Sequence, residues 1–421
     1  MRAFRGFAQK TDMLNYLSMS TLALVVRTIV YNCCPDVISF GKNYPFFITE
    51  ITDWSNVLEC TIRCKLDGLK SNQTIFNQCF CSFIRESPQL FSIFAVLHRV
   101  FGDYILLVFT FTDLVTAFLL CKSFSLLEID RLLVDNSNHV NKVKTEETMM
   151  LYSYLFNPCT IISCCVLSTG SVHNLLLVLS VYLFLSGNKF MCYAITSFIS
   201  IFEIYPIILI PIFVAHFSNK MHHSILKDFL LIAIMSITHI CVGRALSGTW
   251  SFLSSTAGCI LSYCDNKPNI GMWWYIMVEA FSEFKLMETV VLHSAVLFMH
   301  IIPLSVKLRN NKHDALLLSL FIICAFKPYP SMSDFALQIA FFLMRPEWFK
   351  DSNWTNLIVA LYTVGIVLMS ALWNGYAIRK VFNSNFYFVG TTTFSFAQVI
   401  MLEQITKSIK IKGDPEKEKI D

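Results

Sequence analysis

The sequence predicts an all-α, polytopic integral membrane protein. Of its 421 residues, 55% are hydrophobic and only 15% are charged, whereas soluble domains carry about 25% charged residues. Apolar runs near bilayer-crossing length recur along the chain, and a hydrocarbon core about 30 Å thick needs about 20 apolar residues of helix. From these runs we expect about ten to twelve transmembrane or half-spanning helices. They form one polytopic membrane domain, residues 1–406, followed by a charged cytosolic tail, residues 407–421.

The N-terminal part begins with a membrane helix near residues 13–33. Basic residues precede this run and no small-residue cleavage site follows it, so we expect an uncleaved helix with a cytosolic N-terminus. Residues 35–88 then form a lumenal connection, where apolar positions from Val57 to Leu66 predict an amphipathic helix on the membrane surface. Asn72, in Asn-Gln-Thr, is a candidate N-glycosylation site in this connection.

Most of the 15 cysteines lie inside apolar runs, where cysteine behaves as a small hydrophobic residue. Four others lie in the lumenal connection: Cys60, Cys64, Cys79 and Cys81. In an oxidising compartment they can form one or two disulfides. A metal site is the less favoured alternative because no histidine accompanies them, and we expect no metal.

The next segment combines a broken helix with a cytosolic loop. Residues 89–100 are apolar but short, as expected for half of a helix broken against other protein. Residues 104–121 are long enough to cross the membrane, with Asp113 on the inner face. Residues 122–147 mix both charges with polar residues and read as a cytosolic loop with some helix.

Residues 155–211 contain three apolar runs separated by short polar breaks, which predicts tightly linked spanning helices. Asn157-Pro158 is expected to open the first helix, because proline lacks an N–H at a position where none is needed. Glu203 lies inside the third run and should face the protein interior or a wet cavity, with an internally paired structural role as the alternative. A polar group in the first break is expected at a membrane surface: Ser168, Thr169, His173 and Asn174.

The C-terminal half holds further apolar runs and a second lumenal connection, residues 248–270. The runs expected to cross or half-cross the membrane are residues 224–246, 289–306, 315–325, 333–344, 357–373 and 386–405. Phe-Lys-Pro-Tyr-Pro at residues 326–330, followed by Asp334, predicts a break bent around a cavity, since proline interrupts helices.

Enzyme motifs are missing from the sequence. It has no glycine-rich phosphate loop, no H-E-x-x-H and no G-x-S-x-G. A membrane glycosyltransferase would need paired lumenal carboxylates, but the one Glu-x-Asp spacing, Glu128 to Asp130, lies in the predicted cytosolic loop. This counts against such catalysis, although carboxylates distant in sequence can still meet in space. The small net charge of +4 and the lack of a basic stripe exclude nucleic acid as a partner.

An amide-rich group opens the last apolar run. Asn383-Ser384-Asn385-Phe386 precedes it, and Gln398 lies within it. Asparagine beside serine can cap a helix, and its amide can also bind a phosphate or sugar head group. From the residues alone, capping is the favoured interpretation.

Five stretches spread over most of the chain form a distinctive combination. They read NPCTIISCCVLST from Asn157, EIYP from Glu203, PNIGMWWYIMVEAF from Pro268, FKPYPSMSDFALQIAFF from Phe326 and NSNFYFVGTTTFSFAQVIML from Asn383. In these stretches the chain resembles the phosphatidylinositol glycan anchor biosynthesis class U family, the multi-spanning subunit of the GPI transamidase. That family is itself similar in membrane topology to the GPI mannosyltransferases, which implies a glycosyltransferase-C-like architecture.

The resemblance implies a role in the membrane of the endoplasmic reticulum. The complex removes a C-terminal hydrophobic signal from a precursor protein and joins the new carboxyl end to the ethanolamine of a GPI lipid. Catalysis belongs to another, cysteine protease-like subunit, so this chain is expected to be non-catalytic and without a cofactor. Its partners would be the other subunits, the GPI lipid as bound substrate, and the attachment signal of the precursor.

The resemblance also assigns residues to GPI binding. Asn383 and Asn385 become the leading candidates for contact with the ethanolamine phosphate and glycan. Weaker candidates for the wall of the binding cavity are Phe386, Gln398, Tyr329 and Asp334. Two alternatives stay open: a GPI-pathway mannosyltransferase that uses a dolichol-linked donor, and a subunit that only holds the complex together.

The C-terminal tail carries an independent signal for location. Lys417 and Lys419 lie five and three positions from the end, as in a dilysine retrieval signal for the endoplasmic reticulum. Lysines just beyond the last apolar run favour a cytosolic C-terminus. An ordinary solvated, charged tail is the alternative.

Overall fold

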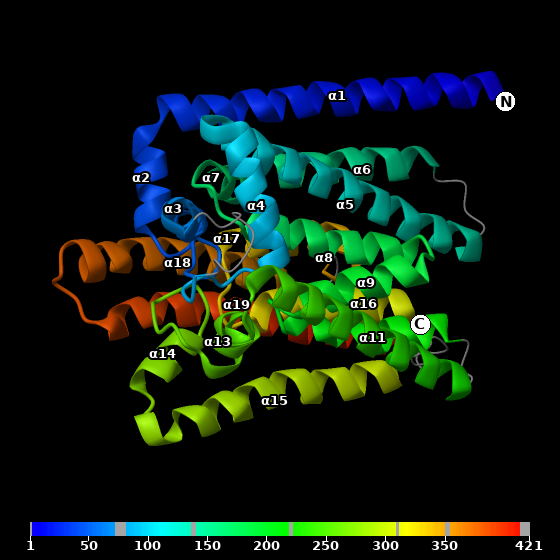
Figure 1. Ribbon diagram of the computed structural model, residues 1–421. Helices are drawn as coiled ribbons and strands as arrows, with labels where there is room; N and C mark the ends of the chain where they lie inside the picture. The colour runs from blue at the N-terminus through cyan, green and yellow to red at the C-terminus, as the bar shows by residue number, and fades with distance from the viewer. Residues whose placement is uncertain are drawn as a thin grey trace.

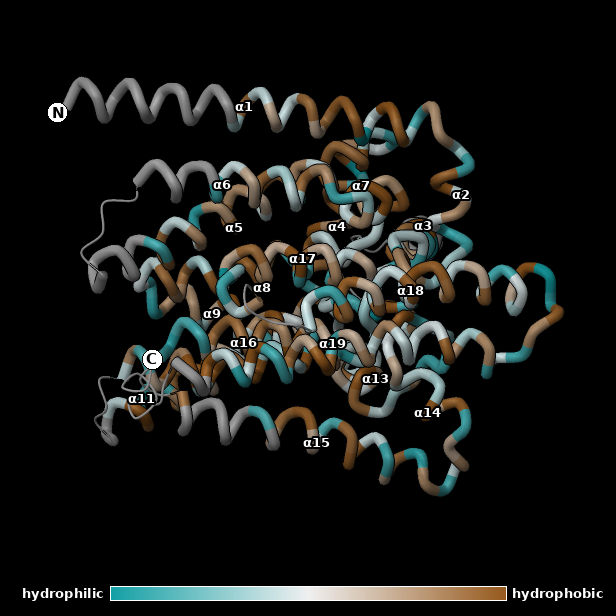
Figure 2. Tube along the Cα trace, turned by 180° about the vertical axis from the view of Figure 1, so that it is seen from behind, coloured by the Kyte–Doolittle hydropathy of each residue, from teal (hydrophilic) through white to brown (hydrophobic). Residues whose placement is uncertain are grey.

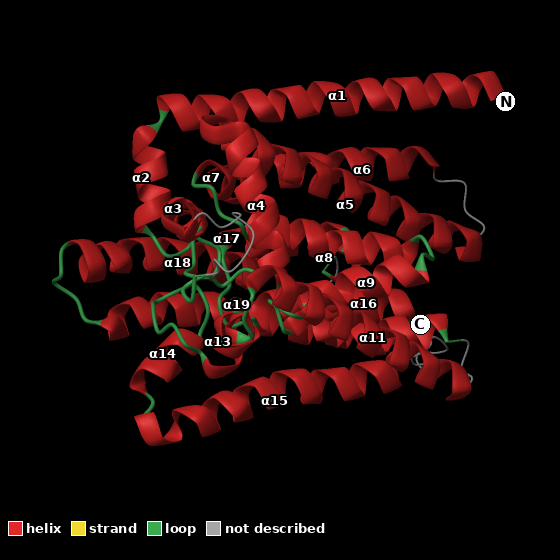
Figure 3. Cartoon of the chain, in the orientation of Figure 1, coloured by secondary structure: helices red, strands yellow, loops and turns green. Residues whose placement is uncertain are grey.

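The computed structural model is helical throughout, with loops gathered mainly at one end of the molecule (Figure 3). It describes residues 2–71, 81–135, 140–218, 222–308, 311–349 and 354–412. Within these ranges no β-strand forms, and Asp53 and Ser168 make an isolated antiparallel bridge. The all-α prediction is therefore confirmed.

The first half of the chain places α1 along one edge of the molecule, with α5 and α6 beside it (Figure 1). Its elements are α1 (Arg2–Cys33), α2 (Pro35–Asn43), α3 (Trp54–Ser71), α4 (Pro88–Phe101), η1 (Gly102–Tyr104), α5 (Ile105–Asp135), α6 (Val140–Leu155), α7 (Pro158–Cys165), α8 (Gly170–Leu185) and α9 (Lys189–Ile199). Helices α1 and α2 form a pair bent by 86°. Both connections contain helix, as predicted: α2 and α3 lie within residues 35–88, and α5 and α6 extend into residues 122–147.

The second half contributes the central helices α16 and α17 and the opposite edge, α15 (Figure 1). Its elements are η2 (Tyr205–Ile208), α10 (Leu209–Phe217), α11 (His222–Ser247), α12 (Ser251–Ser255), α13 (Ala257–Ser262), α14 (Trp273–Glu279), α15 (Ser282–Lys307), α16 (Lys312–Phe326), α17 (Met332–Leu343), η3 (Pro346–Trp348), α18 (Thr355–Trp373), η4 (Asn374–Ile378) and α19 (Ser384–Lys412). Helices α18 and α19 form a hairpin that projects at the loop-rich end (Figure 1). Because α19 continues to Lys412, the predicted tail begins as helix.

Apolar residues fill the middle of the helices, and polar residues concentrate toward their two ends (Figure 2). In the described ranges three helical segments are long and apolar enough to cross a membrane: Pro88–Glu128, Ser224–Ser247 and Thr355–Ile378. The bent pair of α1 and α2 gives a fourth if it counts as one span. The molecule is thus a membrane protein by composition and helix length, while ten to twelve spans stays a prediction.

The helices within residues 155–211 are shorter than the sequence predicts. The longest, α8, has 16 residues, which at about 1.5 Å per residue reaches roughly 24 Å. Side-chain caps start two of these helices. The Asn157 side chain accepts a hydrogen bond from the Cys159 N–H at the start of α7, and the Asn188 side chain accepts one from the Met191 N–H at the start of α9. The prediction of three full spans here is not confirmed, because these helices are shorter than the about 20 residues that cross a bilayer.

A buried ion pair ties α1 to the helices beside it. The Arg27 guanidinium lies 3.1 Å from Asp113 of α5, and both side chains are buried. Arg27 also donates a hydrogen bond to the Leu155 carbonyl at 3.0 Å. One cation therefore joins α1, α5 and the end of α6, and the inward position predicted for Asp113 is confirmed.

Two glycines allow α18 and α19 to approach closely. A Cβ on Gly390 would lie 2.8 Å from the Met369 nitrogen, and a Cβ on Gly365 would lie 3.0 Å from the Phe394 nitrogen. Backbone atoms cannot move aside as flexible side chains can. Glycine is therefore required at both positions of this hairpin.

We expect Gly390→Val to destabilise the protein by about 1–3 kcal/mol, because overpacking at a close contact forces the backbones apart. The measurement is the thermal unfolding midpoint of the purified, detergent-solubilised protein. Thr392→Val, at an exposed position on the same helix, is the control and should leave that midpoint unchanged. An unchanged midpoint for Gly390→Val would show that the hairpin is looser than described.

Candidate functional site

The segment between α2 and α3 is fastened to the N-termini of two other helices. The Met332 N–H, at the start of α17, donates to the Phe46 carbonyl at 2.7 Å. The Thr169 N–H, just before α8, donates to the Thr52 carbonyl at 2.9 Å. Since helix N-termini carry free N–H groups, these bonds satisfy them while fixing residues 46–53 in place.

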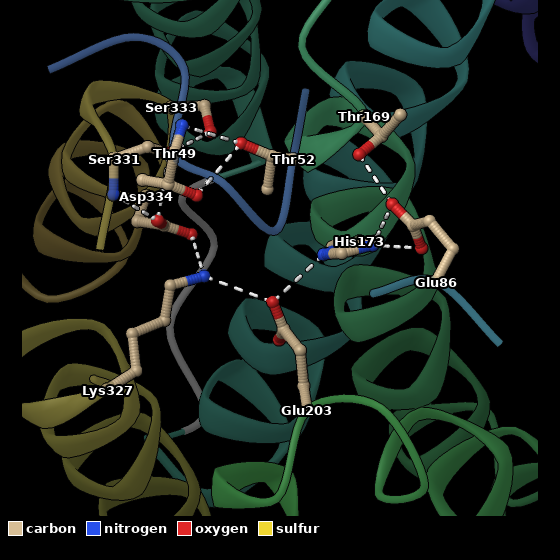
Figure 4. A network of polar contacts seen from close by, with 10 residues as sticks. All are labelled: Thr49, Thr52, Glu86, Thr169, His173, Glu203, Lys327, Ser331, Ser333 and Asp334. Carbon is tan, nitrogen blue, oxygen red and sulfur yellow. Dashed lines mark hydrogen bonds and ion pairs between the residues drawn. The ribbon is translucent and has the colours of Figure 1, made fainter. Parts of the chain in front are cut away.

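Below this segment lies a chain of buried charged groups (Figure 4). His173 of α8 sits between two carboxylates, with Nε2 2.9 Å from Glu86 and Nδ1 3.1 Å from Glu203. Thr169 donates its hydroxyl to Glu86 at 2.6 Å. Because one histidine meets a carboxylate at each ring nitrogen, it links the segment before α4 to the segment between α9 and η2.

Lys327 continues the chain toward α17 (Figure 4). Its Nζ lies 3.1 Å from Glu203 and 2.7 Å from Asp334. Asp334 in turn accepts hydrogen bonds from the Ser331 N–H at 2.7 Å and from the Ser331 hydroxyl, as part of a capping box at the start of α17. Buried charges need such partners, because an unpaired one is costly.

This network corrects one expectation and confirms another. Glu203 faces the interior, as predicted, and contacts both Lys327 and His173. The polar group expected at a membrane surface is instead buried inside the protein: Ser168, Thr169, His173 and Asn174. Thr169 and His173 find side-chain partners within the fold and do not need the surface. The Ser168 hydroxyl and the Asn174 amide nitrogen are buried without a hydrogen-bond partner among the described residues.

A cavity of about 1090 Å³ opens above residues 46–53. Its wall comes from the ends of α1 and α2, the start of α3, the turn η1, the loop before α14, and Tyr329. One part is apolar, including Leu58, Leu107 and Leu167. The charged residues of the wall are Lys42, Glu50, Asp53, Asp103, Asp265 and Lys267. Small-molecule sites typically enclose about 300–1,000 Å³, so the cavity has the size of a ligand site.

Two groups of the wall are electrostatically linked. Burial raises the pKa of Asp265 and Glu50 raises it further, although the Lys267 N–H and charge act against them. Burial would lower the pKa of Lys267, but its hydrogen bond and ion pair with Glu50 outweigh burial and raise it. The contact with Glu50 therefore favours the charged form of Lys267.

The α18–α19 hairpin presents the amide group of the last helix. Asn383 and Asn385 are exposed, as is Phe386 at 49%. The Asn385 side-chain oxygen accepts a hydrogen bond from the Tyr275 hydroxyl of α14 at 2.8 Å. This oxygen therefore bonds another helix rather than capping its own.

Comparison with known proteins identifies the family of this chain. A family described as "PIG-U: GPI transamidase subunit PIG-U" matches residues 21–394. The chain belongs to this family. Curated relatives agree: "GPI-anchor transamidase component PIGU" of Homo sapiens is 26% identical over 384 residues, 84% of this chain and 85% of the relative. "GPI transamidase component GAB1" of Saccharomyces cerevisiae is 25% identical over 248 residues, 58% of this chain and 62% of the relative.

The stretches that carried the resemblance to the PIG-U family converge in the fold. Glu203 comes from the EIYP stretch, and Lys327 and Asp334 come from the FKPYPSMSD stretch. Thr169, which ends the NPCTIISCCVLST stretch, contacts Glu86. These stretches therefore build the support under the cavity wall.

The six predicted GPI-binding residues lie in four separate places. Tyr329 lines the cavity and bonds the Asp265 backbone, and Asp334 belongs to the charge network beneath it. The two asparagines and Phe386 lie at the hairpin. Gln398 is buried between helices, 3.5 Å from Gln338. Their role in binding GPI stays a prediction for this PIG-U family member.

The disulfide prediction for the connection at residues 35–88 is confirmed for one pair, Cys60 and Cys81. The Cys64 sulfur lies 3.8 Å from that of Cys60. A second disulfide, Cys259–Cys264, closes the turn after α13 and was not foreseen. Four predicted positions lie outside the described residues: Asn72, Cys79, Lys417 and Lys419.

Sequence reasoning missed Glu86, His173 and Lys327 as partners of Glu203. One signal was available, because a lysine between apolar runs needs a counter-charge. The identity of that counter-charge depends on contacts between distant segments. The sequence therefore could have indicated a network without giving its members.

Proposed function

We propose that this chain is the non-catalytic, GPI-holding subunit of the transamidase in the endoplasmic reticulum membrane. Membership of the PIG-U family and the names of its relatives as transamidase components support the place in the complex. The chain would bind GPI so that its ethanolamine amine meets the acyl intermediate on the catalytic subunit. Holding two reactants in the correct orientation can lower the activation barrier by about 7–11 kcal/mol without any catalytic group on the protein that holds them.

The observation that carries the lipid-holding role is the exposed amide group at the hairpin. Asn383 and Asn385 are both exposed, and amide N–H₂ groups donate to phosphate and sugar oxygens. Arg379 and Lys380 are exposed in the same hairpin and would favour a phosphate. Exposed Phe386 would contact the lipid beside them.

The proposed setting follows from the charge pattern of the sequence. Ten to twelve transmembrane or half-spanning helices would form a glycosyltransferase-C-like, multi-pass domain within residues 1–406. The connection at residues 35–88 would face the lumen, and residues 122–147 and 407–421 would face the cytosol. The hairpin, the cavity and the lumenal connection would then share one side, where the other subunits and the precursor's attachment signal would meet.

The test is surface display of a GPI-anchored reporter in cells lacking this protein. The native chain should restore display, and the double variant Asn383→Ala/Asn385→Ala should reduce it at least about tenfold, because hydrogen bonds to charged groups contribute about 1.5–3 kcal/mol each. The variant should still assemble with the complex, and complete GPI lipid should accumulate. Asn266→Ala, an exposed asparagine outside the hairpin, is the matched control and should restore display fully.

The alternatives predict other results in the same cells. If complete GPI is missing without the protein, the chain acts earlier as a mannosyltransferase, and the holding role is wrong. If the double variant restores full display of the reporter, the chain is instead a subunit that only holds the complex together. The two asparagines would then only support the hairpin.

A further inference from the structure

Charged side chains of both signs line the cavity without an ion-pair partner among the described residues. Lys42 lies in the last turn of α2 and Asp53 precedes α3, and neither side chain forms an ion pair with any residue that the structure describes. One Asp53 oxygen accepts a hydrogen bond from the Ser55 N–H at 2.8 Å. The other carboxylate oxygen has no hydrogen-bond donor among the described residues. Outside the Glu50–Lys267 pair, the described residues of the wall thus offer one cation without an ion pair, Lys42, and three carboxylates without one: Asp53, Asp103 and Asp265.

A second set of charges extends this pattern. Glu50 and Lys267 form an ion pair on the wall, and the Lys267 N–H donates to Asp265 at 3.2 Å. Both signs thus recur on the wall, and neither covers it alone. A ligand of one sign would meet repulsion from part of this surface, whereas a zwitterionic ligand finds a partner for each of its charges.

The apolar part of the cavity reaches the outer surface of the molecule at η1 and the start of α5. Leu106 is buried and Leu107 is 42% exposed, so consecutive residues of the wall pass from interior to outer surface. Tyr104, also on the wall, is 71% exposed. Apolar side chains continuous with the outer surface suit an acyl chain that enters the cavity from the bilayer.

The wall distinguishes among lipid head groups. A primary ammonium donates hydrogen bonds to carboxylates, which a quaternary ammonium cannot do. A phosphate suits Lys42 and Lys267 as point charges. A lipid without an amine would leave the carboxylates desolvated and unpaired, which is costly. The combination matches phosphate and primary amine in one head group.

We propose that this cavity binds the phosphoethanolamine head group of a membrane lipid. The phosphate lies toward Lys42 and Lys267, the ammonium toward Asp53, and an acyl chain along Leu58 and Leu107. The hairpin contributes Trp373 to the wall, but neither Asn383 nor Asn385 lines the cavity, so this site is distinct from the two asparagines. The head group has two sources with the same chemistry: phosphatidylethanolamine, and the ethanolamine phosphate of GPI, in which case the cavity extends the proposed function.

The test is photo-crosslinking on the purified complex with a photoreactive phosphatidylethanolamine probe. The probe should label peptides of the cavity wall. Unlabelled phosphatidylethanolamine should compete at least about tenfold better than phosphatidylglycerol or phosphatidylcholine, since a lost charge-assisted bond is worth about a factor of ten or more. Equal competition by phosphatidylglycerol, or labelling elsewhere only, would overturn the proposal.

Lipid extracted from the complex identifies the source. A co-purified phosphoethanolamine lipid that persists in cells blocked at the first step of GPI synthesis is the phospholipid. One that disappears in those cells is GPI. If the native complex carries no phosphoethanolamine lipid from either cell line, the proposal is wrong.

Variants separate this site from the hairpin. Lys42→Ala/Asp53→Asn should lower probe labelling at least about tenfold, while Lys122→Ala/Glu59→Gln, exposed charges outside the wall, should not. Asn383→Ala/Asn385→Ala should keep full labelling even if it loses reporter display. If Lys42→Ala/Asp53→Asn does not assemble, a second variant, Leu58→Trp, tests the site by filling the cavity with a larger side chain. This variant should lower probe labelling. Undiminished labelling of Leu58→Trp would contradict the proposal.

Discussion

Lys327→Met is expected to remove most of the folded protein. Lys327 is the cation between Glu203 and Asp334, and the side chains of all three are largely buried. Breaking a buried ion pair by removing one partner costs about 3–5 kcal/mol, because the remaining charge is left uncompensated. Such a loss is a large part of the total stability of about 5–15 kcal/mol of an ordinary domain. The measurement is the steady-state amount of protein together with its thermal midpoint in detergent.

Two further variants show whether charge is the cause. Lys327→Arg keeps the cation and should retain much more protein than Lys327→Met. Adding Glu203→Gln and Asp334→Asn to Lys327→Met removes the stranded carboxylates and should recover part of the loss. If the methionine variant alone unfolds at the native temperature, the network does not stabilise the fold.

Arg27→Met should have a comparable effect at the other buried pair. The change leaves Asp113 buried without its cation and leaves the Leu155 carbonyl without that donor. We expect a loss of about 3–5 kcal/mol, for the same reason as at Lys327. The thermal midpoint of the purified protein and the protection of α1 from protease both measure it.

The double variant Arg27→Met/Asp113→Leu tests the pair as a unit. Replacing a buried ion pair with apolar residues of similar volume is often neutral or stabilising. The double variant should therefore be more stable than Arg27→Met alone, and a midpoint no higher than that of the single variant would contradict the pairing.

Local signals in the sequence predicted much of the fold. Asn157-Pro158 starts α7, and the proline pair after Lys327 separates α16 from α17 as expected. The inward position of Glu203 followed from the cost of a carboxylate in an apolar run. Each of these inferences depends on a residue and its near neighbours.

Features assembled from distant segments could not be predicted in the same way. Glu86 contacts His173, and Lys327 contacts Glu203, although the partners in each pair are far apart in the sequence. No sequence motif or residue spacing indicates these pairs. The cavity wall likewise joins residues from Thr28 to Trp373. The hydropathy of residues 155–211 also led us to overestimate the length of the helices there, because a buried turn can be as apolar as a buried helix.

The Arg27–Asp113 pair also bears on the order of synthesis. Asp113 is made 86 residues after Arg27, which at about 5–20 residues per second takes roughly 4–17 s. During that interval the arginine has no carboxylate from α5, although a charged residue at the centre of a membrane helix costs about 2.5–3.5 kcal/mol on insertion. The arginine of the first helix therefore gains its carboxylate only after the fifth helix has been made, and its bond to the Leu155 carbonyl only after the sixth.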